Sequence, residues 1–319
     1  MTVSLVKHQP IDGSSVILSR VTAANLIGVK PMLKFVILLT LSVAVSLYSS
    51  SNFGAAPSSS QLPTDGRLVG GQASIVQQGS VMDITQTSSR AAITWNAFDI
   101  GSAATVNISQ PDASSVLANQ VLSSDPSQIF GQLNANGQVF LTNPNGVYFA
   151  PGASVNVGGL VATTNTINAA DFMAGITTFE GDGSSANVIN EGNLQATLGG
   201  YIALMAPTVR NDGVIIAKMG SIVLAAGSQY VLEFSGASLD AVAVSPAEID
   251  TLVSNGNAIY APGGRIILSA QAARHIQSGV VGNTGVIEAT GFTSNGGVIS
   301  LTASHNIFAG GTIRADSEG

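Results

Sequence analysis

The chain has no cysteine and few charged or aromatic residues. Charged residues make up 9% of the 319 residues and aromatic residues 5%, whereas charged residues are about a quarter of an average globular domain. Without cysteine, neither a disulfide nor a thiolate metal site can form. The low charge is unlike that of an ordinary globular enzyme, and it suits stacked strands whose surface consists of Ser, Thr, Asn and Gly.

Basic residues are scarce beyond residue 56. The formal net charge is -7 and the pI is near 4.7. Lys7, Lys30 and Lys34 precede residue 56, and only Lys218 follows it. Binding to nucleic acid depends on Lys and Arg that neutralise phosphates. The composition therefore predicts that nucleic acid is not a partner.

An apolar segment with basic residues before it lies near the N-terminus, ahead of residue 57. The run Phe35–Leu47 follows Lys30 and Lys34 and is succeeded by the small residues Gly54–Ala56. This pattern is typical of a signal peptide, and the run is short for a membrane span, so a retained transmembrane helix is the minor alternative. We predict a signal peptide over 32–56 and a mature chain that begins near Pro57. Residues 1–31 are either an extended leader or a mis-assigned start, and we favour Met32 as the start.

Two short phrases alternate in the second half of the chain. The phrase Asn-x-Gly-x-Ile/Leu-x-Ala begins at Asn190, Asn211 and Asn283, with an echo at Gly311, and the phrase Gly-x-Ile-x-Leu-x-Ala begins at Gly200, Gly220, Gly264 and Gly297. Alternating apolar residues are typical of half-buried strands, and a repeat of about 20 residues is typical of a solenoid turn. The repeats over 186–315 therefore predict an all-β, right-handed parallel β-helix, with Ile215 and Leu224 pointing inward.

The remaining segments are predicted to cap or interrupt the solenoid. Strands over 69–84 and 91–108 form an N-terminal β cap, because an uncovered solenoid end exposes unpaired strand edges, and Trp95 and Phe98 plug that end. Residues 114–129 form either a short helical turn or a strand. Segments 171–185 and 230–261 interrupt the repeat and are expected outside the helix, as extra-helical strands or a short helix.

The most specific stretch is Gly137–Thr164, where short apolar runs are separated by sharp turns. Between Val139–Leu141 and Val147–Phe149 stands Asn143-Pro144-Asn145-Gly146. Pro pre-sets the second position of a β-turn, Asn bonds back to the backbone, and Gly suits the fourth position. These four residues predict a type I turn at a corner of the solenoid.

This turn and the run Gly152–Thr163 resemble the N-terminal secretion domain of filamentous haemagglutinin-type exoproteins, the passengers of two-partner secretion in Gram-negative bacteria. The resemblance is close over about 66–166 and continues upstream through Trp95, Phe98 and Gln110. It implies that 57–319 is a two-partner-secretion domain, and that Asn143, Pro144, Asn145 and Gly146 are associated with secretion competence. Whether the turn is recognised or only structural stays open. The upstream Asn-Pro-Asn-Leu motif of some members is absent.

The resemblance further implies a route and a destination. The chain would cross the inner membrane by the Sec machinery and the outer membrane through a dedicated β-barrel transporter with periplasmic recognition domains, whose strands can pair with an extended segment. It would act as a secreted or cell-surface adhesin or haemagglutinin that meets a host-cell or bacterial surface receptor. The alternative within this class is the stalk of a contact-dependent toxin.

A polysaccharide lyase or hydrolase is the alternative from another class, because parallel β-helices also house such enzymes. Their chemistry needs converging carboxylates or a base beside a calcium site. The candidate carboxylates are Asp171, Glu180 and Asp182 in one loop and Asp240, Glu248 and Asp250 in another. Their spacing fits neither arrangement, and His275, His305 and Arg274 form no catalytic motif. We predict solvated loop charges, no enzyme activity, no cofactor and no metal.

Overall fold

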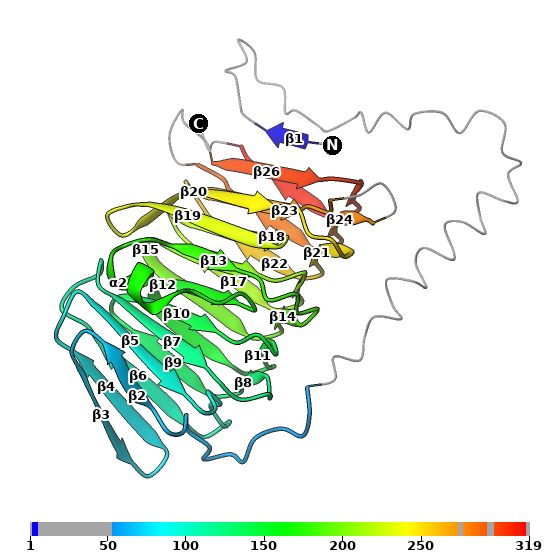
Figure 1. Ribbon diagram of the computed structural model, residues 1–319. Coiled ribbons are helices and arrows are strands. Elements are labelled where there is room, and N and C mark those ends of the chain that lie inside the picture. Colours follow the sequence, from blue (N-terminus) through cyan, green and yellow to red (C-terminus); the bar gives the residue numbers. More distant parts are fainter. Residues whose placement is uncertain (1, 6–52, 274–276, 292–296, 317–319) are drawn as a thin grey trace, which may run out of the picture. The chain divides into compact units, whose positions relative to one another are not determined.

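The chain winds into a parallel β-helix whose short strands stack in three faces (Figure 1). The computed structural model describes residues 2–5, 53–273, 277–291 and 297–316, and the unit considered below comprises residues 1–7 and 56–319. The predicted all-β fold is confirmed. The predicted signal-peptide run Phe35–Leu47 and the choice of start at Met32 lie outside the described residues.

Each turn of the helix, or rung, contributes one strand to each face. The first face contains β4 (Val81–Gln86), β6 (Thr105–Ser109), β9 (Gln132–Ala135), β12 (Ser154–Thr163), β15 (Asn193–Met205), β17 (Val214–Ala217), β22 (Ala258–Tyr260), β25 (Val286–Glu288) and β28 (Thr312–Arg314). The second face contains β5 (Arg90–Trp95), β7 (Val116–Val121), β10 (Gln138–Thr142), β18 (Ser221–Ala226), β23 (Arg265–Ala270) and β26 (Val298–Ala303). The long strands β12 and β15 run around the corner and belong to both faces.

The third face is a separate seven-stranded parallel sheet. It contains β8 (Ser127–Ile129), β11 (Val147–Phe149), β14 (Asn187–Asn190), β16 (Thr208–Asn211), β21 (Thr251–Asn255), β24 (Gly279–Asn283) and β27 (Asn306–Ala309). The segment 114–129, for which the sequence left two possibilities, forms strands β7 and β8. Tyr230–Ala261 was predicted to lie wholly outside the helix, and this is wrong for its end, because β21 and β22 are regular strands of the stack.

The interior is filled by the inward residues of the repeat phrases. Ile215 stacks between Leu194 and Ile259, and Leu224 stacks in register with Leu204 and Leu268. Both Ile215 and Leu224 are fully buried, so the predicted phase of the repeat is confirmed. Because each strand of the stack buries its inward side chains against the rungs above and below, the core is one continuous column.

The first rung is closed by an N-terminal β cap, as predicted, but the cap is smaller than predicted. The segment 91–108 was assigned to the cap, and this is wrong because β5 and β6 pair in parallel with the following rungs. β3 (Ala73–Gln78) pairs with β4, and β2 (Arg67–Gly70) pairs with β5, both in antiparallel register. Trp95 and Phe98 are buried and meet edge to face at 5.5 Å, while the indole N–H of Trp95 donates to Asn119 Oδ1 at 3.0 Å. At the other end, β1 (Thr2–Leu5) pairs antiparallel with β26.

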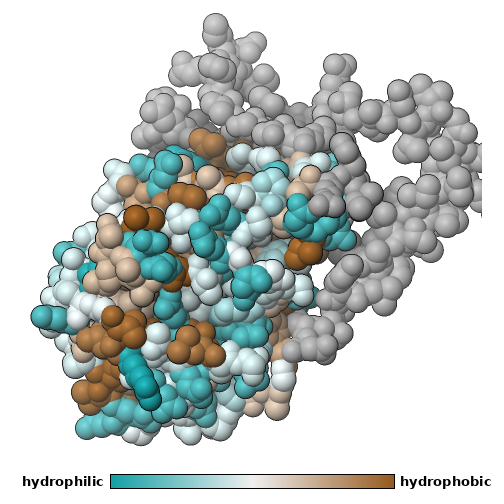
Figure 2. All heavy atoms as spheres, viewed as in Figure 1, coloured by the Kyte–Doolittle hydropathy of each residue, from teal (hydrophilic) through white to brown (hydrophobic). Residues whose placement is uncertain are grey.

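A layer outside the helix covers part of the second face. It consists of α2 (Ala169–Met173), β13 (Thr178–Glu180), and the hairpin of β19 (Gln229–Ser235) and β20 (Ser238–Ser245), with β13 paired to β19. Phe140 on the outer side of β10 contacts the rings of Phe172, Phe179 and Phe234 at centroid distances of 5.9, 5.7 and 6.2 Å. The visible surface over this layer shows only separated hydrophobic patches (Figure 2). Both sides of the second face are therefore buried where the layer lies, which the repeat phrases alone did not predict.

Among the described residues, no helix is long and apolar enough to cross a membrane.

Candidate secretion site

Asn143–Gly146 form a four-residue turn between β10 and β11, as predicted. The N–H of Gly146 donates to the carbonyl of Asn143 at 3.0 Å, which closes the turn. Gly146 has a φ of +114°, a backbone conformation that residues with a Cβ rarely adopt. Glycine at this position is therefore required by the backbone.

Asn143 is a buried brace and not a surface residue. Its side chain is fully buried, and its Nδ2 donates to the carbonyl of Asp125 at 3.0 Å and to Ser127 Oγ at 3.1 Å. Its Oδ1 accepts the backbone N–H of Asn145 at 2.9 Å. Asn143 thus fastens the turn to the start of β8 and the loop before it, in the preceding rung.

Pro144 and Asn145 form the outward part of the turn. Asn145 is exposed, and its Nδ2 donates to the carbonyl of Ser123 at 2.8 Å. The carbonyl of half-buried Pro144 accepts the hydroxyl of Ser184 at 2.6 Å. Ser184 follows β13, so the turn lies between the preceding rung and the covering layer. The exposed amide and the proline ring are groups that a protein partner can contact.

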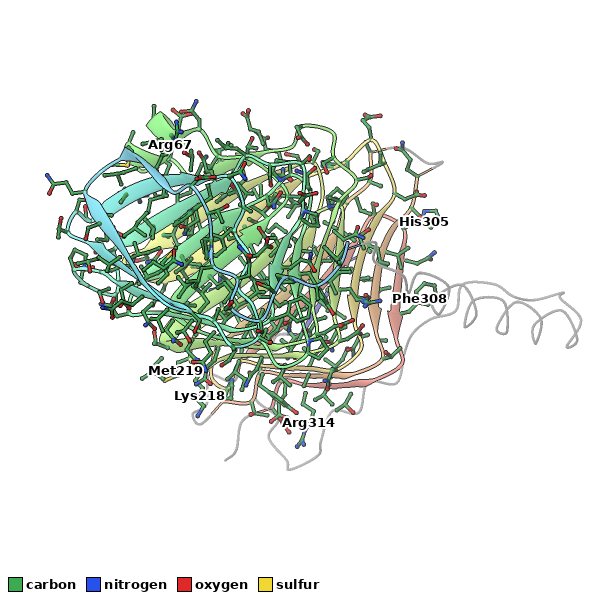
Figure 3. The ribbon with its side chains drawn as sticks, turned by 90° about the horizontal axis from the view of Figure 1, so that it is seen from below. Arg67, Lys218, Met219, His305, Phe308 and Arg314 are labelled. Atoms are coloured by element: carbon green, nitrogen blue, oxygen red, sulfur yellow. The ribbon has the colours of Figure 1, made fainter. Side chains whose placement is uncertain are left out.

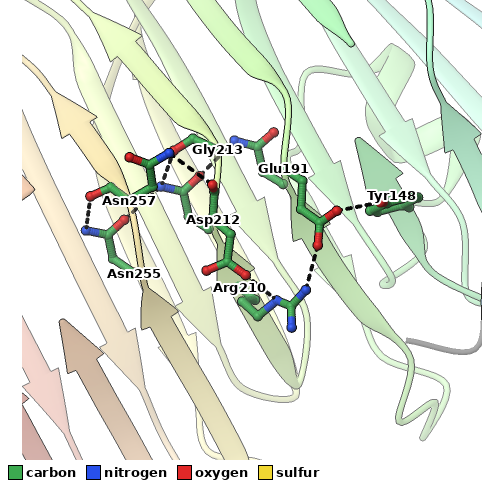
Figure 4. Close-up of polar contacts among 9 residues, drawn as sticks. Tyr148, Glu191, Arg210, Asp212, Gly213, Asn255 and Asn257 are labelled. Carbon is green, nitrogen blue, oxygen red and sulfur yellow. Dashed lines mark hydrogen bonds and ion pairs between the residues drawn. The ribbon is translucent and has the colours of Figure 1, made fainter. Parts of the chain in front are cut away.

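A charged network on the third face begins two residues after the turn. The hydroxyl of Tyr148 donates to Glu191 Oε2 at 2.5 Å, and Arg210 pairs with Glu191 Oε1 at 2.8 Å and with Asp212 Oδ2 at 2.9 Å (Figure 4). Burial, the hydrogen bond to Glu191 and the charge of Glu191 raise the pKa of Tyr148 to about 12. The sequence carried a signal for this network, because Glu191 and Asp212 both occupy the variable position of Asn-x-Gly and must stack in successive rungs.

The asparagines of the first repeat phrase form a ladder inside the helix. Nδ2 of Asn190 donates to Oδ1 of Asn211, Asn211 donates likewise to Asn255, and Asn255 to Asn283, each at 2.7 Å. All four side chains are buried. Sequence reasoning missed Asn255, because there the phrase reads Asn-Gly-Asn and the third position holds Asn257 instead of glycine.

The six candidate carboxylates, Asp171, Glu180, Asp182, Asp240, Glu248 and Asp250, are all exposed. Asp182 and Glu248 come from different excursions and line one hollow of about 210 Å³, a proximity that their spacing did not predict. Asp250 instead accepts the backbone N–H of Ser278 at 2.6 Å. Within the described part of the chain, no three His, Cys, Asp or Glu residues form a group that could hold a metal ion. His305 is exposed, and Arg274 and His275 lie outside the described residues.

Comparison with known proteins gives concordant results. The family model of the TPS secretion domain matches residues 60–315. A heme/hemopexin-binding protein of Haemophilus influenzae is 33% identical over 274 residues, which cover 82% of this chain and 29% of that protein. A second heme/hemopexin-binding protein of Haemophilus influenzae is 31% identical over 243 residues, covering 70% and 26%. The chain thus spans less than a third of the length of these curated relatives.

A solved structure shows the same fold. The HMW1 secretion domain from Haemophilus influenzae superimposes with a TM-score of 0.65 at 27% identity, over 80% of this chain and 74% of that chain. The family match extends from the N-terminal cap to the last rung and includes the turn at Asn143–Gly146. The chain therefore belongs to the TPS secretion domain family, the secretion domains of two-partner secretion exoproteins.

Proposed function

We propose that this chain directs export of a surface exoprotein through a dedicated outer-membrane β-barrel transporter, and that the turn Asn143–Gly146 serves this export in two separate ways. Membership of the TPS family implies a partner transporter and a secreted or surface-associated product. The observation that carries the proposal is the division of the turn into a buried half and an exposed half. Asn143 sets the fold of the corner, and Asn145 with Pro144 offers the contact to the transporter.

The surface role that we propose is adhesion, as in haemagglutinin-type exoproteins. The relatives named for heme/hemopexin binding favour ligand capture as a second candidate. However, the matched region is the secretion domain and covers under a third of those proteins, so the likeness supports shared export more directly than shared binding.

The test is to express the chain together with its transporter and to compare the protein in the culture supernatant with that in the periplasm. We expect Asn145→Ala to lower secretion strongly while the melting temperature of the refolded protein changes little. Asn143→Ala is expected to lower both, because it removes a buried brace.

Asn257→Ala is the matched control. Asn257 is also an exposed asparagine at a corner, and its Nδ2 donates to one backbone carbonyl, that of Asp212, at 3.1 Å. We expect this variant to be secreted normally. Normal secretion of Asn145→Ala, or an equal loss with Asn257→Ala, would refute recognition of the turn by the transporter.

A further inference from the structure

Met219 adopts a backbone conformation that glycine adopts at the equivalent corners of the neighbouring rungs. It lies at the corner between the first and second faces with a φ of +52°, while the equivalent corners hold Gly199 at +77° and Gly263 at +68°. The equivalence follows from the hydrogen bonds: Gly199 donates to the carbonyl of Lys218, and Met219 donates to that of Pro262. Methionine is strained in this region relative to glycine.

The packing of the fold does not explain why methionine, and not glycine, stands at this corner. Its side chain is 62% exposed and points away from the body of the helix, next to Lys218 (Figure 3). A side chain that is mostly exposed offsets little of this strain through burial. Strained residues gather at binding and active sites, so the exposed side chain itself is the feature to explain.

Met219 borders a hollow of about 340 Å³, a volume within the range of small-ligand sites. One wall is the row of corners, and the other is the start of β20, which is anchored by Ser238 Oγ to the Gly199 carbonyl at 3.2 Å and by Ser221 Oγ to the Leu239 carbonyl at 2.8 Å. Each serine hydroxyl uses its proton in this anchor, so its oxygen can still accept a hydrogen bond from a ligand.

The hollow is lined by one cationic residue, Arg265, and one carboxylate residue, Asp240, and these two side chains form no ion pair with each other. In the described part of the chain, carboxylates pair with Arg210 and Arg314, whereas none lies within ion-pair distance of Lys218 or Arg265. Arg265 lines the hollow and donates one N–H to the carbonyl of Asp240. A guanidinium has five donors, and a pair of them matches a carboxylate.

We propose that this hollow binds a sugar residue that carries a carboxylate. Arg265 pairs with the carboxylate, and Lys218 adds attraction at the rim. Ser221, Ser238 and Asp240 accept the ring hydroxyls, and the soft Met219 side chain covers the apolar face of the ring. The hollow shares no lining residue with the turn Asn143–Gly146, and the inference does not depend on how the chain is exported.

The test is titration of the purified chain with D-glucuronate, followed by calorimetry or ligand-observed NMR. We expect millimolar affinity for glucuronate, and binding at least about tenfold weaker for glucose, which lacks the carboxylate, and for acetate, which lacks the ring. Equal binding of acetate would reduce the hollow to a simple anion site, and equal binding of glucose would remove the role of Arg265. Either result, or no binding of glucuronate, overturns the proposal.

Variants separate a ligand role from a structural one. Met219→Gly is expected to keep or raise the melting temperature, because it relieves the strained backbone, and to weaken glucuronate binding about fivefold. Arg265→Lys keeps the charge but loses the paired donors, and about tenfold weaker binding is expected. Leu198→Ala is the control, since Leu198 is 73% exposed nearby but does not line the hollow. Unchanged binding in Met219→Gly, or an equal loss in Leu198→Ala, would contradict the assignment.

Discussion

At the residue scale, asparagine side chains determine the hydrogen bonding inside the helix. The buried ladder from Asn190 to Asn283 satisfies polar side chains that would otherwise be stranded in an apolar column. Asn211 is the informative member, because it accepts from Asn190 and donates to Asn255, so its loss removes the partners of Asn190 Nδ2 and Asn255 Oδ1.

We expect Asn211→Ala to lower the free energy of unfolding by about 1–3 kcal/mol, the usual cost of buried polar groups left unsatisfied. Chemical denaturation of the two proteins measures the difference. Asn257→Ala, which removes an exposed amide, is the comparison and should cost well under this value. A loss no larger than that of the comparison would mean that water or a neighbour replaces the ladder bonds.

Tyr148 predicts a dependence of stability on alkaline pH. Its pKa is raised to about 12 in the folded chain, chiefly by burial and then by Glu191, from about 10 for a free phenol. The folded state therefore keeps a proton that the unfolded state releases, so this stabilisation is present below pH 10 and is lost as the pH rises towards 12.

We expect Tyr148→Phe to lose less stability than the wild type across this interval in urea unfolding at successive pH values. Superimposable pH profiles would show that Tyr148 is not linked to folding. Burial also raises the pKa values of Tyr201 and Tyr230, so part of the alkaline loss should remain in the variant.

At the scale of elements, inward and outward positions of one strand differ sharply. Ile215 is fully buried in β17, while Ile216 beside it lies on the outer side and is half-buried. We expect Ile215→Asp to destabilise the fold by several kcal/mol, because an unpaired carboxylate would enter the core, and Ile216→Asp to cost far less. Melting temperatures of the two variants check this. Similar melting temperatures for the two variants would contradict the assignment of Ile215 to the core side of β17.

The covering layer depends on Phe140, which contacts three aromatic rings from α2, β13 and β19. We expect Phe140→Ala to cost about 3–5 kcal/mol and to loosen the layer, given the usual cost of removing a buried aromatic ring. Hydrogen exchange over 229–245 should quicken in this variant. Unchanged protection of the β19–β20 hairpin would show that the layer is held by its other contacts.

The sequence predicted the roles of the inward-facing residues of each strand better than those of the outward-facing residues. Ile, Leu and Ala at alternate positions were sufficient to place Ile215 and Leu224 in the core. The excursions over 171–185 and 230–261 were predicted to lie outside the helix, but only the outward positions of the strands indicate which rungs they cover. These positions read Tyr201, Ala203 and Met205 in β15 but Val298, Ser300 and Thr302 in β26, so the outward positions are all apolar in the covered strand and mostly polar in the uncovered one.

The position of the turn Asn143–Gly146 was predictable from the sequence, but its division into a buried half and an exposed half was not. The backbone preferences of Pro144 and Gly146 are sufficient to predict a turn. The burial of Asn143 depends on Asp125 and Ser127, and the outer contact of Pro144 depends on Ser184, residues that are distant along the chain. Likewise the sequence did not identify Asn255, because Asn257 occupies the position, two residues later, where the other phrases have glycine.

At the scale of the whole molecule, residues 57–319 are expected to give a far-UV circular dichroism spectrum dominated by β-structure. In the described residues, α2 is a single five-residue helix beside many strands. Helix content above about a quarter for residues 57–319 would be incompatible with this fold, since about a third is ordinary for globular proteins.

The direction of the ladders has a mechanical consequence. Backbone hydrogen bonds and the asparagine amides join one rung to the next, while the chain itself runs across the stack. Tension between the two chain ends is transmitted through the stack, but it concentrates on the bonds where the chain leaves an outermost rung, so that rung detaches first. Each rung that peels away releases about 70 Å of extended chain for some 20 residues. A protein built this way lengthens under load in discrete steps, dissipating work at each one while the rungs that remain keep their structure.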